Sequence, residues 1–369
     1  MKLILSSEAI SPPLTGIGRY TWELASRLPA VQDIHVRFFR QGRWIPDPAL
    51  LLNPELPHIR RTWLQRQEPR WLRESRLKWD CLGAVFHGPN FFLPACADIG
   101  VVTIHDLSVF KYPETHPIER IRQYEREFDS TIKRAAHLIA VSEVMRQEIV
   151  AFLGWPADRI TTVPNGASGK FSPKSGPELL PFLQRFDLKG DGYALCVSTL
   201  EPRKKIENLL QAYKLLPQGL RERFPLILAG SPGWLSDALH EEIEHCTKQG
   251  WLRYLGFVPE ADLPVLYAGA RLFVYPSIYE GFGLPVLEAM ASGIPVVTSD
   301  RSSLPEVTGG AALLVDPDDI DSLADSIRKG LCDDEWRESA TSLGLSVSQG
   351  YSWERCVRET VEVYRHVMR

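Results

Sequence analysis

Short apolar runs alternate with helical patterns along almost the whole chain. Such an alternation is typical of βαβ units, because a parallel strand needs a crossover, usually a helix, to return to its sheet. The chain is therefore predicted to be an α/β protein with mostly parallel sheets. The runs are Lys2–Ser7, Ile34–Arg40, Leu82–His87, Val101–Ile104, Leu138–Val141 and Ile160–Val163, followed by Tyr193–Ser198, Pro225–Ala229, Leu252–Gly256, Leu272–Tyr275, Ile294–Thr298 and Ala312–Val315.

A segment rich in Gly, Ser and Pro separates the two sets of runs. Asn165–Pro177 has no apolar periodicity and is interpreted as an interdomain linker. A chain of 369 residues exceeds the usual size of one hydrophobic core, so two domains are expected. Ligands of open parallel sheets bind beyond the carboxyl ends of the strands, so the cleft between the two domains is the predicted site.

Composition excludes some classes of function. The formal net charge of −4 argues against a dedicated nucleic-acid binder, which carries a basic excess. The six cysteines occur singly, with no C-x-x-C pair, and are expected to be buried thiols in a reducing compartment. The apolar run at the N-terminus is too short for a signal peptide, and no stretch approaches the ~18 apolar residues of a membrane span. These features predict a cytoplasmic protein.

Residues 60–79 differ from the rest of the predicted first domain. They hold seven basic residues against Glu68 and Glu74. Two interpretations stay open: a solvated basic helix whose tryptophans pack on the core, or a patch that contacts anionic headgroups through its cations and the membrane interface through its tryptophans. The basic residues are Arg60, Arg61, Arg66, Arg70, Arg73, Arg76 and Lys78, and the interleaved tryptophans are Trp63, Trp71 and Trp79.

The strongest chemical signal lies in residues 279–297. Pro285 suits the first turn of a helix, and Gly293 suits its end before the next strand. Gly281 and Gly283 directly precede this helix and allow close approach of a ligand, so free N–H groups and the positive end of the helix dipole face the predicted cleft. The segment is predicted to cradle a diphosphate.

Two carboxylates flank this cradle, Glu280 before the helix and Glu288 within it. At this spacing one carboxylate can reach hydroxyls of a sugar while the other accepts hydrogen bonds from a ribose. The alternative is an ordinary strand, loop and helix with two surface glutamates.

With this motif the chain resembles glycosyltransferase family 4, whose E-x7-E motif corresponds to Glu280–Glu288. The resemblance implies a GT-B fold of two Rossmann-like domains facing across a cleft, with Glu280 near the donor sugar and Glu288 on the ribose. It further implies an acceptor-binding domain at 1–170, onto which a C-terminal helix at about 352–369 packs, and a donor-binding domain at 171–351. The implied donor-binding residues of the cradle are Gly281, Phe282, Gly283 and Leu284.

Residues 198–210 form the first strand-to-helix turn of the second domain. Arg203 and Lys204 there are predicted to meet the diphosphate and to stabilise its charge as the glycosidic bond breaks. The sequence departs from the commoner family pattern, with Thr199 in place of an Arg and Lys205 in place of an Asn. A solvated helix start is the alternative.

Further site residues come from both predicted domains. Gly16 and Gly18, in a loop after the first strand, allow close approach of a phosphate or acceptor; alone they are weak evidence, because the dinucleotide fingerprint ends in Thr21 instead of Gly. The resemblance places His105 at the donor sugar, against the alternative of a histidine bonded to its own loop, and Val258 in the loop that holds the base. Ser302, Ser303 and Glu306 are expected beside the diphosphate, or else a serine caps the helix.

The acidic run at residues 316–319 is interpreted as a turn and helix start in front of Ile320. No D-x-D motif stands in the expected cleft, so the predicted enzyme needs no metal and no cofactor beyond its nucleotide-sugar substrate. The resemblance implies retention of the anomeric configuration. Residues 199–204 and 302–307 resemble bacterial mannosyltransferases of O-antigen assembly, which suggests GDP-mannose or a derived donor such as GDP-rhamnose, and a lipid-linked oligosaccharide acceptor at the inner membrane face. A nucleotide-sugar epimerase or hydrolase and a non-catalytic sugar-nucleotide-binding protein remain the alternatives.

Overall fold

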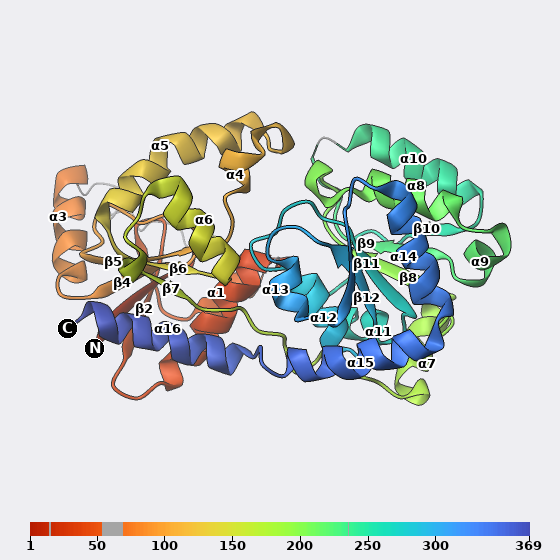
Figure 1. Cartoon of the computed structure of the whole chain (residues 1–369). Coiled ribbons are helices and arrows are strands. Elements are labelled where there is room, and N and C mark those ends of the chain that lie inside the picture. Colours follow the sequence, from red (N-terminus) through yellow and green to blue (C-terminus); the bar gives the residue numbers. More distant parts are fainter. Residues whose placement is uncertain (15, 54–68, 235) are drawn as a thin grey trace. The chain divides into compact units, whose positions relative to one another are not determined.

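The computed structural model describes residues 1–14, 16–53, 69–234 and 236–369, which fold into two α/β units (Figure 1). The N-terminal unit comprises Met1–Leu107, Glu119–Asn165 and Trp353–Arg369, and the C-terminal unit comprises Ser108–Ile118 and Gly166–Ser352. The chain passes from the N-terminal to the C-terminal unit between Asn165 and Gly166, at the start of the predicted linker, and returns between Ser352 and Trp353. Ser108–Ile118 belongs to the C-terminal unit although it lies within the first half of the chain, which the sequence did not predict.

The sheet of the N-terminal unit has the order β3-β2-β1-β4-β5-β6-β7. Each pair of neighbours is parallel except β2 and β3. Leu3 in the interior strand β1 lies beside Val36 on one side and Val85 on the other, so apolar side chains are in register between these three strands. The strands are β1 (Lys2–Ser6), β2 (His35–Arg40), β3 (Arg43–Ile45), β4 (Val85–Gly88), β5 (Ile99–Ile104), β6 (Ala135–Ala140) and β7 (Ile160–Thr162).

The antiparallel strand β3 was not predicted. Gln41 and Gly42, which join it to β2, have φ values of 49° and 76°. Positive φ at both central residues is the geometry of a type I′ turn, which gives the twist of a tight hairpin. Arg-Gln-Gly-Arg between two short apolar stretches is the sequence signal for this turn.

Helices cover this sheet, and the C-terminal helix α16 (Trp353–Val367) returns to the N-terminal unit, where it contacts α1 and β6 (Figure 1). In the core beneath it, His87 Nδ1 is 2.6 Å from the Tyr364 hydroxyl and His87 Nε2 is 2.8 Å from Thr103 Oγ1. These bonds satisfy both ring nitrogens away from water. The other α-helices of this part of the chain are α1 (Gly16–Arg27), α3 (Arg70–Cys81), α5 (Ile118–Arg134) and α6 (Glu143–Leu153).

Acid is expected to destabilise the protein partly through His87. Burial first, and then the charge of His105, lowers the pKa of His87 to about 3. The unfolded histidine takes up a proton near pH 6.5 while the native one does not, so stability is complete above that pH and falls on acidification. Between pH 7 and pH 4 the loss from this residue is ~3 kcal/mol. Urea unfolding at both pH values measures it, and a His87→Gln variant with an undiminished acid loss would contradict it.

The sheet of the C-terminal unit has the order β10-β9-β8-β11-β12-β13 and is parallel throughout. Each of the twelve apolar runs predicted to be strands overlaps a strand of one of the two sheets, which confirms that part of the prediction. The strands of this unit are β8 (Ala194–Val197), β9 (Leu226–Ala229), β10 (Leu252–Tyr254), β11 (Leu272–Tyr275), β12 (Val296–Ser299) and β13 (Ala312–Val315).

Three helices of the C-terminal unit, α7, α14 and α15, begin at a side-chain cap. Ser175 and Glu178 form a capping box at the start of α7, and the Asp319 carboxylate accepts from Ser322 N at the start of α14, as expected for residues 316–319. The helices are α4 (Ser108–Lys111), α7 (Gly176–Arg185), α8 (Ile206–Leu215), α9 (Gln218–Arg223), α10 (Asp237–Lys248), α11 (Leu263–Ala268), α12 (Leu284–Ala291), α13 (Leu304–Thr308), α14 (Ile320–Cys332) and α15 (Asp334–Ser348).

The cysteines correct one expectation. Cys332 is exposed and Cys96 is half-buried, so only the other four are buried thiols. In the part of the chain that the structure describes, no helix is both long enough and apolar enough to cross a membrane.

Candidate active site

The predicted cradle lies between β11 and α12 in the C-terminal unit. Gly283 is the residue before α12, with φ 107° and ψ 48°, a conformation that favours glycine. Pro285 occupies the first turn, where it costs no hydrogen bond. A Cβ on Gly283 would lie 2.7 Å from Leu304 Cδ2, so the turn is tight as well as left-handed. The backbone N–H groups of this turn can bind an anion.

Replacement of Gly283 by alanine is expected to weaken donor binding by about tenfold. A side chain at this φ costs about 1–2 kcal/mol, and the contact with Leu304 adds to that. Titration with the nucleoside diphosphate measures the change. Gly310→Ala is the matched control, because Gly310 also has a positive φ of 85° but no atom within 4 Å of its Cβ position. Equal binding by the two variants would contradict a role of Gly283 in the cradle.

The Glu280 carboxylate in this loop is fixed by four neighbouring side chains. Its Oε1 accepts hydrogen bonds from Ser277 Oγ at 2.6 Å and from the Tyr275 hydroxyl at 3.0 Å. The same oxygen pairs with Lys204 Nζ, and Oε2 lies 3.4 Å from Arg203 Nη1. Tyr275 ends β11 and Ser277 follows it, so the strand end itself orients the carboxylate. The alternative of a surface glutamate is wrong for this residue.

The charges of this cluster balance one another. Burial by itself would raise the pKa of Glu280, but the adjacent Lys204 and Arg203 outweigh it and hold that pKa below its usual value. Glu280 is therefore ionised at neutral pH, and both cations are paired. Arg203 Nη2 also lies 3.4 Å from Glu201 Oε1. Any anionic ligand of these cations must share them with two buried carboxylates.

Arg203 and Lys204 are presented by a 3-10 turn, η5 (Pro202–Lys204), that follows β8. Arg203 Nη1 donates to Tyr279 O at 2.7 Å, and Lys204 Nζ donates to the Tyr275 hydroxyl at 2.8 Å. Lys205 then adopts φ 52° and ψ 39° before α8. Asn tolerates this left-handed conformation best among residues with side chains, which is a physical reason for Asn at this place in related sequences. A solvated helix start is excluded for Lys204, whose side chain is 8% exposed.

Ser302 and Ser303 hold the Glu280 loop from the other side. Ser302 Oγ donates to Glu280 O at 2.5 Å, and Ser303 Oγ donates to the same oxygen and to Phe282 O, each at 2.8 Å. Neither side chain caps α13, so the alternative interpretation as a helix cap is wrong. Glu306 lies in the first turn of α13.

Ser108–Ile118, the segment assigned above to the C-terminal unit, supports the same loop. The ring of Tyr112 lies 5.2 Å from the ring of Tyr279, and Lys111 Nζ lies 5.2 Å from the centre of that ring. Trp234 Nε1 donates to Thr115 O at 2.6 Å. Tyr112 and Lys111 thus contact the neighbour of Glu280, and no local pattern in the sequence indicated them, because they are more than a hundred residues away along the chain.

The other donor-binding residues predicted in this unit lie in α12, in the loop before it and in the segment after β10. Glu288 lies in α12 and is buried near the Tyr267 hydroxyl, whose pKa is raised by burial and by the Glu288 charge. Phe282 is buried, and its ring contacts Tyr351. Val258 lies after β10 and is buried, whereas its neighbour Phe257 is exposed. The structure therefore brings Arg203, Lys204 and Glu280 into direct contact, whereas a contact of Val258 or Glu288 with the same ligand stays a prediction.

In the N-terminal unit, His105 directly follows β5. Its Nε2 donates to Pro89 O at 2.8 Å, on the loop after β4, so it is not bonded to its own loop. The edge of the ring contacts Tyr20, with 4.9 Å between ring centroids. Burial lowers the pKa of His105 to about 4, although the Pro89 bond and the Asp106 charge partly oppose this. The ring is thus neutral at physiological pH.

The glycines predicted in a loop of this unit lie in a helix instead. α1 begins at Gly16, and Gly18 falls in its first turn. A Cβ on Gly18 would lie 2.8 Å from Ala9 O, so this glycine lets the helix pack tightly on the chain after β1. The approach of the backbone to a ligand, which was the expected role of the two glycines, stays a prediction.

A pocket of about 640 Å³ lies at the carboxyl ends of β1 and β4 in the same unit. Gly18 and Pro89 line it, so it adjoins both α1 and the carbonyl group that holds His105. Its walls combine aromatic rings with amide and charged groups, a mixture suited to sugar rings and their hydroxyls. The rings are those of Phe39, Phe92 and Tyr124, and the polar groups are those of Ser6, Glu8, Asn90, Arg120, Gln123 and Glu127.

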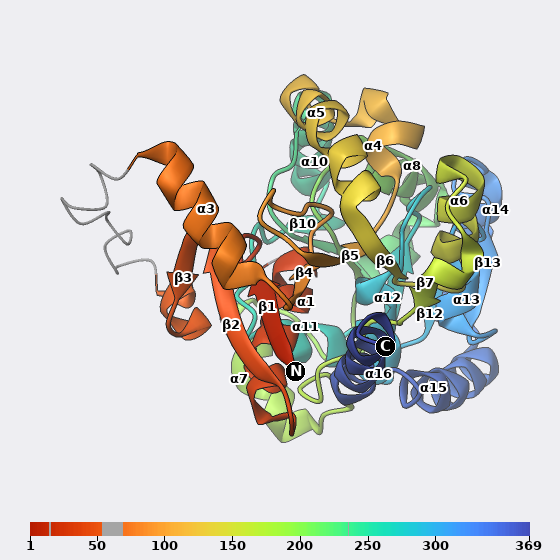
Figure 2. The same ribbon diagram turned by 90° about the vertical axis from the view of Figure 1, so that its left-hand side faces the viewer.

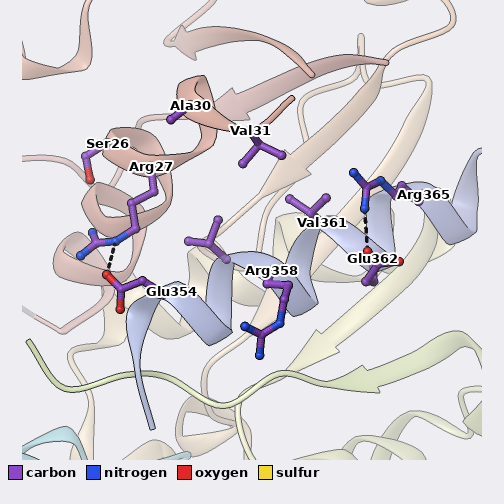
Figure 3. A pocket seen from close by; sticks show the side chains of 10 residues that line it. Ser26, Arg27, Ala30, Val31, Glu354, Arg358, Val361, Glu362 and Arg365 are labelled. Atoms are coloured by element: carbon purple, nitrogen blue, oxygen red, sulfur yellow. Dashed lines mark hydrogen bonds and ion pairs between the residues drawn. The ribbon is translucent and has the colours of Figure 1, made fainter. Parts of the chain in front are cut away.

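A second pocket of this unit, of about 460 Å³, lies between the end of α1 and α16 (Figure 3). Val31 and Val361 lie in its apolar part, and Arg27 points to Glu354 across its rim (Figure 3). Because α1 runs back from the carboxyl end of β1, this pocket is near the amino ends of the strands. It is therefore separate from the edge at which His105 lies.

Comparison with known proteins agrees with these observations. The family model described as "Glycosyltransferase Family 4" matches residues 14–168, and the model described as "Glycosyl transferases group 1" matches residues 184–344. A solved structure, "WaaG, a glycosyltransferase involved in lipopolysaccharide biosynthesis", has a TM-score of 0.73 at 17% identity and covers 99% of both chains. The fold is GT-B, with two Rossmann-like parallel-sheet units, as the sequence predicts.

The family follows from curated relatives. O-antigen chain mannosyltransferase B of Escherichia coli is 44% identical over 99% of this chain and 100% of its own length. O-antigen chain mannosyltransferase RfbU of Salmonella typhimurium is 28% identical over 62% of this chain and 59% of its own. The chain belongs to glycosyltransferase family 4.

Proposed function

We propose that this protein transfers mannose, with retention of configuration, from GDP-mannose to a lipid-linked oligosaccharide during O-antigen synthesis. The cluster of Arg203, Lys204 and Glu280 beside the α12 turn carries the donor half of the proposal. The names of the relatives at 44% and 28% identity support mannose and O-antigen. The 6-deoxy sugar rhamnose, from GDP-rhamnose, remains the second donor to test.

The leaving diphosphate needs positive charge as the glycosidic bond breaks. An ammonium group has three N–H donors, and those of Lys204 are used by Glu280 and Tyr275 in two bonds, which leaves one for a phosphate oxygen. Together with the N–H groups of the α12 turn, Lys204 and Arg203 can supply the stabilisation that a metal ion supplies in other enzymes. The proposed reaction therefore needs no metal ion.

Retention by way of a covalent intermediate would need a carboxylate free to attack the sugar. Both Glu280 oxygens already face cations or hydroxyl groups, so this carboxylate is suited to orient the sugar rather than to attack it. We favour attack of the acceptor hydroxyl on the face that the diphosphate leaves. A donor phosphate oxygen accepts the hydroxyl proton as the new glycosidic bond forms.

The pocket beside Pro89 suits the acceptor glycan, because its rings and polar groups match those of a sugar chain. The lipid carrier of that acceptor would place the enzyme in the cytoplasm at the inner face of the membrane, with residues 60–79 as its contact. Residues 60–68 of that segment, with Trp63, lie outside the described residues.

Incubation with a panel of nucleotide sugars tests the proposal. GDP-mannose, GDP-rhamnose and UDP-glucose are each supplied with and without a mannose-terminated oligosaccharide, and release of the nucleoside diphosphate is followed together with the product. GDP release from GDP-mannose that depends on the acceptor, with an α-linked product, is the expected result. Donor consumption without acceptor would favour an epimerase or hydrolase, and donor binding without turnover would favour a binding protein.

A further inference from the structure

Helix α3 exposes large apolar side chains on one face. Trp71 is 69% exposed and Trp79 is 78% exposed, and Leu72 and Leu82 are exposed as well. Leu77 and Cys81, on the opposite face of the helix, are buried. The interpretation that these two tryptophans pack on the core is therefore wrong.

The helical repeat gathers these residues into one stripe. At 3.6 residues per turn, Trp71, Leu72 and Trp79 fall within an arc of about 100°, and Ser75 lies between them. Arg76 and Lys78 flank this arc on its two sides. The acidic residues Glu74 and Asp80 fall outside it.

The helix is held to its unit by the side away from this stripe. Trp44 Nε1 in β3 donates to Asp80 Oδ2 at 3.1 Å, and Leu77 and Cys81 are buried beneath the helix. Figure 2 shows α3 on the outside of the N-terminal unit, near β3. The exposed stripe is thus a fixed surface of a folded helix.

We propose that the α3 face, defined by Trp71, Leu72, Trp79 and Leu82 with Arg76 and Lys78, docks this unit on a membrane that carries anionic lipid headgroups. Indole rings settle at the boundary between headgroups and acyl chains, and leucines bury apolar area there. Lysine and arginine beside them attract the anionic headgroups. The inference rests on the membrane location proposed above and names its surface and lipid class.

Vesicle flotation measures the docking. The wild-type chain is expected to bind phosphatidylglycerol vesicles at least about tenfold more tightly than phosphatidylcholine vesicles, because each cation near the surface contributes about 1 kcal/mol. The double variant W71S/W79S and the single variant Lys78→Glu should each lose at least about tenfold of this affinity. Phe152→Ser is the matched control, because Phe152 is also an exposed aromatic residue of the N-terminal unit, on α6.

Two results would overturn this inference. One is vesicle binding by W71S/W79S and Lys78→Glu equal to that of wild type and Phe152→Ser. The other is a wild-type dimer that W71S/W79S converts to a monomer without any change in vesicle binding, because a second copy would then cover the face.

The failure of the inference is distinguishable from failure of the proposed activity. Transfer to a short water-soluble oligosaccharide should be unchanged in W71S/W79S, whereas transfer to a lipid-linked acceptor in anionic vesicles should fall at least about tenfold. Loss of transfer to both acceptors would show that the face has another role and would overturn the docking. Wild-type transfer to neither acceptor would instead contradict the proposed function.

Discussion

Replacement of Lys204 by alanine is expected to lower the rate of transfer at least about 100-fold, the scale of losing a preorganised transition-state contact. The change removes the ammonium group that Glu280 and the Tyr275 hydroxyl hold in place. The charge that develops on the leaving diphosphate then loses one of its two cations. Because the contact strengthens as the bond breaks, the loss should appear in kcat as well as in kcat/KM.

The neighbouring lysine provides the control for this prediction. Lys205 is only one residue away and is also positively charged, but its Nζ pairs with Asp318 at 2.8 Å instead of with Glu280. Lys205→Ala should therefore keep a rate within a few-fold of wild type. Equal losses in the two variants would show that general positive charge, and not the Lys204 contact, accelerates transfer.

Loss of Lys204 also leaves a buried carboxylate without its closest partner, which can destabilise the fold by about 3–5 kcal/mol. The double variant Lys204→Met with Glu280→Gln removes both charges together and separates the two effects. It should recover stability in thermal unfolding while transfer stays low. Near-normal rates in Lys204→Ala, Glu280→Ala and His105→Ala together would contradict the assignment of the site.

The cluster around Glu280 shows which parts of a site a sequence can reveal. Glu280, Gly283 and Glu288 share one strand-to-helix connection, so their spacing predicts their surroundings. Arg203 and Lys204 occupy another connection of the same parallel sheet, and parallel strands bring such connections to one edge. The hydroxyl groups of Tyr275 and Ser277 were missed because ordinary strand-end residues carry no motif, although their position after a buried strand was a usable signal.

The fold, like the site, has some parts that the sequence reveals and others that it does not. The apolar runs predicted every strand that is paired in parallel, because burial on both faces leaves a continuous apolar stretch. The hairpin strand β3 escaped because it pairs antiparallel with β2 through a two-residue turn, so it belongs to no βαβ unit and breaks the alternation of strand and helix. The assignment of Ser108–Ile118 to the C-terminal unit could not be foreseen, because it depends on contacts such as Trp234 with Thr115 that no periodicity encodes.

His105 is predicted to act as a neutral ring, and His105→Ala should also lower the rate at least about 100-fold. With a pKa of about 4, the native ring carries no charge between pH 5.5 and pH 8. His105 should therefore cause no break near pH 6.5 in the pH profile of kcat, and the profiles of wild type and His105→Ala should have the same shape around that pH. A break at that pH that disappears in the variant would mean that His105 titrates in the complex and acts as an acid or base.

A positional role of the ring can be separated from a contact with the substrate. Nε2 donates to Pro89 O, which leaves Nδ1 of the neutral ring as an acceptor for a sugar hydroxyl. Gln can also donate to Pro89 O and still present an acceptor oxygen, so His105→Gln should recover part of the rate that His105→Ala loses. His35→Ala, at an exposed histidine of β2, is the matched control and should leave the rate unchanged. Equal rates for His105→Ala and wild type would remove this residue from the site, whereas equal losses for His105→Ala and His105→Gln would show that the imidazole ring itself contacts the donor.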